Sequence, residues 1–178
     1  MKQIVLFSFL IAVFSAHGQY HEVLQKIHKK GEFNGTAIVI KNGINIYQGA
    51  FGPADKDSSR DLNINSVFRL ASVSKQFTAI AIMKLKQAGN LDYDQKVNTI
   101  LTDFPHENIT IKHLLNHTSG IGDYIEIIKE NFIPQDSTKR HIIGNNEVLD
   151  IFYNTNPKLN FQPGEEYEYS NTGYLVLA

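Results

Sequence analysis

Residues 69–90, RLASVSKQFTAIAIMKLKQAGN, decide the fold of this chain. They predict a helix, because apolar residues recur at helical spacing and Gly89 supplies a stop at the C-terminal end. Since apolar residues lie on nearly every side, we expect this helix to be buried among other helices. Lys75 in its first turn is unusual, because the amine loses hydration and faces the positive end of the helix dipole. The residues that carry the periodicity are Phe77, Ile80, Ala81, Met83, Leu85 and Ala88.

Ser72 precedes Lys75 by three residues, so the hydroxyl and the amine are neighbours on one helix face. A serine hydroxyl is a weak nucleophile until a base takes its proton, and burial at a helix N-terminus favours the neutral amine that can act as this base. Free N–H groups of the first turn can help to stabilise an oxyanion. The pair therefore suits acyl transfer.

The alternative for the same pair is structural: Ser72 caps the helix and Lys75 reaches back to water. A chain of this length contains on the order of one Ser-x-x-Lys by chance. A capping box, however, prefers Glu or Gln at the fourth position, where this chain has a lysine. By itself the pair is compatible with both interpretations.

Composition narrows the classes of protein. The chain has 178 residues, a net charge of -1 and 42% hydrophobic residues, which indicates one domain with a sizeable core. Seventeen basic residues against eighteen acidic ones leave no broad positive field, so a nucleic-acid partner is not expected. The absence of cysteine excludes disulfides, a cysteine nucleophile and a cysteine-linked lipid anchor.

The first eighteen residues have the pattern of an export signal. Lys2 precedes a short apolar run over residues 4–16, and small residues at Ala16 and Gly18 predict cleavage after Gly18. The apolar run is too short to span a bilayer comfortably, so no stable membrane anchor is expected. We expect a secreted or periplasmic protein whose mature part is residues 19–178.

Local patterns assign the remaining elements. Asn42-Gly43 lies between two β-rich runs and predicts a hairpin. We expect an amphipathic helix over residues 20–30 that ends near Gly31, and a polar loop over residues 53–65. A short helix from about Ile111 should be followed by a glycine-rich turn, and a helix over residues 146–153 should be capped by Asn145 or Asn146. A Pro-Gly turn at residues 163–164 should lead into a β-compatible stretch and a new apolar run.

Three stretches occur in a fixed order: FRLASVSK (68–75), LLNHTSGI (114–121) and PGEEYEYSNTGY (163–174). With them the sequence resembles the serine β-lactamase and penicillin-binding protein family, in the branch of class C β-lactamases, D-Ala-D-Ala carboxypeptidases and related esterases. Ser72 and Lys75 match its Ser-x-x-Lys element, while Tyr169 and Asn171 match its Tyr-x-Asn element. The resemblance covers about residues 35–178.

The resemblance implies an α/β fold of the β-lactamase/transpeptidase type, with a helical region and an antiparallel sheet with flanking helices. Ser72 would attack a substrate carbonyl, Lys75 would accept or relay its proton, and Tyr169 would assist as a base or proton relay. Asn171 would hold Lys75 and the substrate amide. Without the resemblance, an aromatic turn that contains a self-capping asparagine is the favoured interpretation of Tyr169 and Asn171.

The implied function is that of an exported serine hydrolase acting on D-alanyl-peptides, β-lactams or small esters, with no metal or organic cofactor. The alternatives are a non-catalytic penicillin-binding or regulatory protein on the same scaffold, or an inactive fragment. In the family, a Lys-Thr-Gly or His-x-Gly element follows on a later strand, and none follows Asn171 here. We therefore expect residues 19–178 to be the N-terminal portion of a domain with an incomplete sheet, and expect this chain alone to turn over little substrate.

Two further groups of residues are weaker candidates. His113 and His117 have the spacing of two zinc ligands on a helix, but the glutamate of His-Glu-x-x-His and an obvious third ligand are missing. His117 begins HTSG, which the resemblance assigns to a structural loop. Glu165 and Glu166 lie near Tyr169 in the sequence and could act as acid/base carboxylates. Adjacent carboxylates in a turn are, however, more simply explained as solvated charges.

Overall fold

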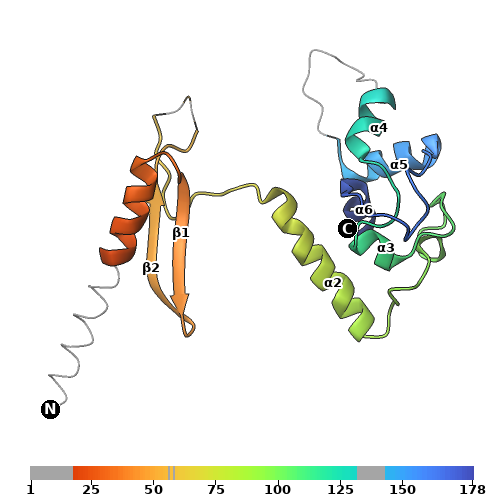
Figure 1. Cartoon of the computed structure of the whole chain (residues 1–178), viewed down its shortest axis with the longest axis horizontal. Helices are drawn as coiled ribbons and strands as arrows, with labels where there is room; N and C mark the ends of the chain where they lie inside the picture. Colours follow the sequence, from red (N-terminus) through yellow and green to blue (C-terminus); the bar gives the residue numbers. More distant parts are fainter. Residues whose placement is uncertain (1–17, 56, 58, 132–142) are drawn as a thin grey trace. The chain divides into compact units, whose positions relative to one another are not determined.

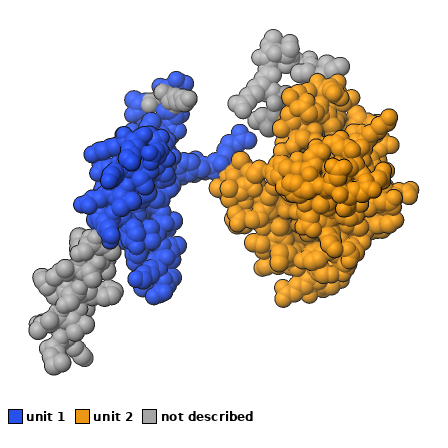
Figure 2. Space-filling view, in the orientation of Figure 1, with its two compact units in different colours: residues 1–69 blue, residues 70–178 orange. Residues whose placement is uncertain are grey.

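The computed structural model describes residues 18–55, 57, 59–131 and 143–178. The chain forms two compact units, residues 1–69 and residues 70–178 (Figure 2). The predicted signal lies outside the described residues except for Gly18, which begins the first described helix. Among the described residues, no helix is both long and apolar enough to cross a membrane.

Unit 1 contains the predicted hairpin. Strand β1 (Gly35–Lys41) pairs with strand β2 (Ile44–Phe51) in an antiparallel ribbon (Figure 1). Asn42 and Gly43 both have positive φ, 52° and 78°, as the two-residue turn that matches the twist of such a ribbon requires. The hairpin prediction is therefore confirmed.

A helix over residues 18–29 packs against this hairpin (Figure 1). Its rings meet aromatic side chains of β2: Tyr20 lies 5.9 Å from Tyr47, and His21 lies 5.4 Å from Phe51, between ring centroids. Tyr47 is only 1% exposed. This confirms the amphipathic helix that the sequence predicts for residues 20–30, including its stop at Gly31, where φ is 76°.

Unit 2 is helical and holds every residue of the predicted site. Its core is formed by apolar side chains that the short elements and the loops between them contribute together, among them Ile109, Leu114 and Phe152, which are fully buried. The elements are η1 (Ala71–Ser74), α2 (Lys75–Gln87), η2 (Val97–Thr99), α3 (Ile111–Leu115), α4 (Tyr124–Asn131), α5 (Asn145–Thr155) and α6 (Asn171–Leu177).

Helix α6 has a central place in unit 2, because it contacts both α2 and α3 (Figure 1). Gly173 of α6 faces α3 at ordinary contact distance: a Cβ atom at this position would lie 3.5 Å from the carbonyl oxygen of Leu114. The packing brings the start of α6, where Asn171 lies, toward the start of α2, where Lys75 lies. The fold thus joins two segments nearly a hundred residues apart.

Helix α2 forms as predicted, with Gly89 at φ 75° beyond its C-terminal end. Its burial within unit 2 differs from the expectation, because Ile82 is the only α2 residue that is buried, while Phe77 and Met83 are exposed. Beyond η1, which directly precedes α2 in the chain, the main neighbour of α2 among the described elements is α6, and a helix of 7 residues covers only part of a helix of 13 residues.

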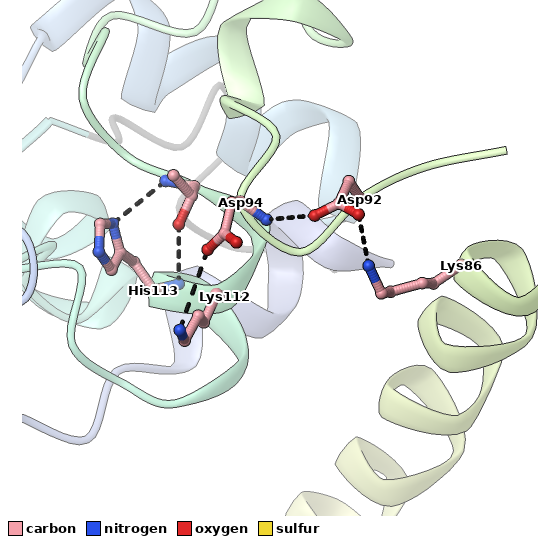
Figure 3. A network of polar contacts seen from close by, with 6 residues as sticks. Lys86, Asp92, Asp94, Lys112 and His113 are labelled. Carbon is pink, nitrogen blue, oxygen red and sulfur yellow. Dashed lines mark hydrogen bonds and ion pairs between the residues drawn. The ribbon is translucent and has the colours of Figure 1, made fainter. Parts of the chain in front are cut away.

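Charged side chains tie the C-terminal end of α2 to the following loop (Figure 3). Lys86 forms an ion pair with Asp92 and lies over the ring of Tyr93, 4.7 Å from its centroid. The hydrogen bond between Lys86 and Asp92 lowers the pKa of Asp92 and raises the pKa of Lys86. Lys112 on α3 lies 3.9 Å from Asp94 of the same loop, so this loop links α2 to α3.

Two local predictions need correction, and one helix was not predicted. The N-cap of α5 is Gly144, not Asn145 or Asn146, and its N–H donates to the Glu147 side chain. Residues 165–169 form no strand, because their neighbour is the loop after α3 and not another extended segment: the Glu168 N–H donates to the carbonyl of His117. Helix α4 follows the glycine-rich turn, where the sequence patterns assigned no element.

Candidate active site

Ser72 and Lys75 meet at the junction of η1 and α2. In a 3₁₀ turn, residues three apart eclipse one another, which places both side chains on one side. The Lys75 Nζ atom donates to the Ser72 Oγ atom across 3.3 Å. Ala71, directly before the serine, has φ 45°, a left-handed conformation that costs an L-residue about 1–2 kcal/mol. Residues in such conformations cluster at functional sites.

The capping alternative for Ser72 does not occur. The N-cap position of α2 belongs to Ser74, whose hydroxyl donates to the carbonyl of Ala71 at 2.7 Å. Lys75 is half-buried and its amine is held by protein groups within unit 2. The Ser72 hydroxyl is therefore directed to the lysine and not to the helix backbone.

The Tyr-x-Asn element completes the constellation. Tyr169 donates from its hydroxyl to the Ser72 Oγ atom at 2.8 Å, and Lys75 donates from Nζ to the Asn171 Oδ1 atom at 2.7 Å. Ser170 between them is extended, with φ -129° and ψ 125°, so its two neighbours point to the same side. All four residues that the sequence predicts thus lie together.

Lysine 75 also shapes the electrostatics of the site. Its Nζ atom lies 5.0 Å from the ring centroid of Tyr169 and 5.6 Å from that of Tyr174. Hydrogen bonding with Lys75 is the largest cause that lowers the pKa of the Tyr169 phenol, and hydrogen bonding with Ser72 is the second, because the amine and the serine hydroxyl can each donate to the phenolate oxygen. A phenol with a lowered pKa gives up its proton more readily than an ordinary tyrosine does.

The support loop, residues 117–123 (HTSGIGD), lies beneath the Tyr-x-Asn element. The His117 ring stacks on Tyr169 with centroids 4.5 Å apart, and its Nδ1 atom accepts the Ser170 N–H at 3.2 Å. The carbonyl of Gly122 accepts from the hydroxyls of Ser170 and Thr172. Burial, and then the charge of Lys75, lowers the pKa of His117, so the neutral ring that can accept this N–H is favoured.

Asp123 at the end of the support loop is the site residue that sequence reasoning missed. Its Oδ2 atom accepts from the Asn171 side-chain amide at 2.6 Å and from the Asn171 backbone N–H at 3.2 Å. Its Oδ1 atom accepts from the N–H of Ile125 at 3.0 Å, as an N-cap residue of α4 does. The sequence offered one signal, an aspartate directly before a helical pattern. This signal indicates a helix cap and does not predict a contact with Asn171.

The weaker candidates have other partners. The Nδ1 atom of His113 accepts the Thr110 N–H in the capping box of α3, while that of His117 accepts from Ser170. Within the described ranges, no group of three or more His, Asp or Glu side chains is placed to hold a metal ion. Glu165 and Glu166 are both exposed to solvent.

The Ser72 hydroxyl lies within reach of an amine and a phenol, on a helical unit joined in sequence to an antiparallel hairpin, which is the arrangement that the resemblance to serine β-lactamases and penicillin-binding proteins implies. The chain belongs to the beta-lactamase family, whose model matches residues 21–178. This match confirms both the resemblance and the fold class drawn from the ordered motifs. The hairpin and helices described above are part of that mixed fold.

Individual relatives agree with this family. The chain is 41% identical over 156 residues to penicillin-binding protein 4* of Bacillus subtilis, with 88% of this chain and 34% of that protein covered. Among solved structures, it is similar to EstCE1, a hydrolase with promiscuous acyltransferase activity (TM-score 0.70, 25% identity, covering 94% and 47%). It is also similar to D-amino acid amidase from Ochrobactrum anthropi (TM-score 0.63, 27% identity, covering 88% and 44%). The chain therefore spans about a third of the length of the curated relative and less than half of these structures.

Proposed function

We propose that this chain is the part of an exported serine hydrolase that carries the nucleophile, and that the enzyme works through an acyl-serine at Ser72. The observation that supports this most directly is the position of the Ser72 Oγ atom, 3.3 Å from the Lys75 amine and 2.8 Å from the Tyr169 hydroxyl. These distances suit transfer of the Ser72 proton to Lys75 and transfer of a proton from Tyr169 to the leaving group.

In the acylation step, neutral Lys75 takes the Ser72 proton while Oγ forms a bond to the substrate carbonyl carbon. The bond from that carbon to the leaving nitrogen or oxygen then breaks, and the leaving atom receives the Tyr169 hydroxyl proton. In deacylation, water gives a proton to the Tyr169 phenolate and attacks the ester carbon. The carbon–Oγ bond breaks and Ser72 regains its proton from the Lys75 ammonium, which restores the starting state.

We propose D-alanyl-peptides as the first substrate class, with β-lactams and small esters as close alternatives. Three relatives support this range: a penicillin-binding protein, a D-amino acid amidase and a hydrolase with acyltransferase activity. All these substrates present a carbonyl carbon to a nucleophile, so they share the Ser72 step. Their leaving groups differ, and the groups that select among them are not among the four residues of the site.

Location outside the cytoplasm is part of the proposal. It is supported by Lys2, the apolar run over residues 4–16 and the small residues before the expected cleavage point at Gly18. Sequencing the N-terminus of the protein recovered outside the cytoplasm tests it. A mature chain that begins at Gln19 supports the proposal, and a chain that retains Lys2 contradicts it.

Labelling with a fluorescent penicillin, followed by a chase with unlabelled compound, tests the function. A label attached to Ser72 that is lost during the chase supports a hydrolase. A label on Ser72 that persists supports the alternative, a penicillin-binding or regulatory protein without turnover. Hydrolysis of a D-alanyl-D-alanine peptide and of a simple ester, both abolished by Ser72→Ala, separates the substrate classes. In a protein that carries the complete domain, the absence of any Ser72-dependent reaction with these compounds contradicts the proposal.

A further inference from the structure

We propose that Asp123 is a positioning residue that fixes the Asn171 amide with its oxygen toward Lys75. This rests on the proposed function, because it gives Asp123 a part in keeping the lysine beside the nucleophile. The arrangement is a chain of four groups: Asp123 Oδ2, the Asn171 amide, Lys75 Nζ and Ser72 Oγ, joined by contacts of 2.6, 2.7 and 3.3 Å.

The asparagine amide has two nearly isosteric ends, one an acceptor and the other a donor. In the structure the Lys75 amine donates to the acceptor end, the Asn171 Oδ1 atom. An ionised carboxylate at the opposite end can only accept, so it requires the NH₂ group of Asn171. Rotating the amide by half a turn would turn the Asn171 oxygen toward the Asp123 carboxylate, placing two acceptors together. The carboxylate therefore allows only one orientation.

Asp123 is itself held on both sides. Oδ2 also accepts the backbone N–H of Asn171, the first residue of α6, while Oδ1 accepts the N–H of Ile125 in α4. Both carboxylate oxygens are thus occupied by donors from two different helices. An asparagine at position 123 would have one oxygen for these tasks and would present an NH₂ group on the other side.

Two distances show how Asn171 affects the position of Lys75 beside Ser72. Asn171 holds the Lys75 amine more closely, at 2.7 Å, than the serine does, at 3.3 Å. If the Asn171 oxygen turns away, the flexible lysine loses its nearer partner and no longer stays beside Oγ. At metal sites, changing a group that orients a metal ligand typically costs on the order of 10–100-fold in activity, and Asp123 orients Asn171 in a comparable way. We expect this range for the acylation rate of Asp123→Asn.

Asp123→Asn also keeps the fold, because Asn is as good an N-cap residue as Asp for α4. The matched control is Glu126→Gln, which removes a negative charge from the first turn of the same helix, where Glu126 pairs with Lys129. Thermal unfolding of both variants shows whether the helix is retained. The control should acylate at the wild-type rate.

The test is a double-mutant cycle in the full chain, with fluorescent penicillin as the acylating probe. Asp123→Asn should slow acylation about 10–100-fold in the wild-type background and by less than about 2-fold in Asn171→Ala, because its effect passes through that amide. An equal loss in both backgrounds, or no loss in either, overturns the proposal.

Side-chain amide NMR of Asn171 decides the same point without any reaction. We expect Asp123→Asn to shift the Asn171 NH₂ resonances and to speed their hydrogen exchange at least about 10-fold, and Glu126→Gln to do neither. Unchanged resonances in Asp123→Asn overturn the role of Asp123. If no probe acylates the wild-type protein but these resonances respond, the proposed function fails while the orientation of Asn171 by Asp123 stands.

Discussion

The Tyr169 hydroxyl donates a hydrogen bond to the Ser72 Oγ atom at 2.8 Å, although the two residues are 97 positions apart. Local chain geometry cannot produce this contact. It exists because α6 packs against α2, so that the extended Tyr-x-Asn element reaches the start of the nucleophile helix. The site is therefore a product of unit 2 as a folded whole.

Replacing Ser72 with alanine should abolish acylation, while Ser74→Ala should leave most of it. The Ser72 Oγ atom contacts both Lys75 and Tyr169, whereas the Ser74 hydroxyl is bonded to the Ala71 carbonyl. Loss of a serine nucleophile costs on the order of 10⁶ in rate in another serine hydrolase. Mass spectrometry of the labelled protein measures this directly. Label retained in Ser72→Ala would show that another residue is the nucleophile.

Lys75→Arg should fail almost as badly as Lys75→Ala. Arginine keeps the positive charge but does not give up a proton in proteins, so it cannot serve as the base for Ser72. A positioned acid or base contributes about 10²–10⁴-fold, and both variants should lose acylation in this range. Stopped-flow labelling gives the rate constants. An arginine variant that acylates at nearly the normal rate would reduce Lys75 to an electrostatic anchor.

Spacing predicts the contact of Ser72 with Lys75, whereas the resemblance of the ordered motifs assigned Tyr169 and Asn171 to the site. Ser72 and Lys75 are three residues apart, and Tyr169 and Asn171 alternate about an extended residue, so each pair shares one side. Joining the two pairs needed the order of the motifs, since no local rule sets a contact between distant segments. The hairpin was predictable for the same reason as the contact of Ser72 with Lys75: the Asn42-Gly43 turn is a local signal.

Other features depend on tertiary packing and were not predictable in this way. Asp123 is 48 positions from Asn171, and an aspartate before a helix indicates a cap whether or not its second oxygen reaches another segment. The apolar periodicity of α2 indicates a helix but not which of its faces unit 2 covers, so the exposure of Phe77 and Met83 was missed. Residues 165–169 have β-forming side chains yet lack a strand partner.

Tyr169 should titrate at a lower pH than an ordinary tyrosine, because its hydrogen bonds to Lys75 and Ser72 lower its pKa. Ultraviolet absorbance of the phenolate during an alkaline titration measures this. Tyr169→Phe should remove the earliest step, and Lys75→Met should move that step to higher pH because it deletes the main cause. Tyr167→Phe is the matched control and should leave the step in place. Persistence of the early step in Tyr169→Phe would assign it to another phenol.

Acid should destabilise unit 2 below about pH 6.5. Burial lowers the pKa values of His106, His113 and His117, so each ring is less easily protonated in the folded protein than in the unfolded chain. The unfolded state then binds more protons as the pH falls through the unfolded pKa, and the free energy of unfolding decreases. The decrease stops below the folded pKa values, where both states are protonated. Urea denaturation at a series of pH values measures this slope.

His117→Gln isolates one part of that slope. Glutamine does not titrate, so the variant should lose less stability than the wild type between pH 7 and pH 5, with the remaining slope due to His106 and His113. At pH 7 it should be less stable by about 1 kcal/mol, because the ring contact with Tyr169 is lost. Acylation at pH 7 should slow as well, since Tyr169 loses the surface that holds it against Ser72. An unchanged pH slope would mean that His117 is not protonated differently in the folded and unfolded states, and that the proton uptake has another source.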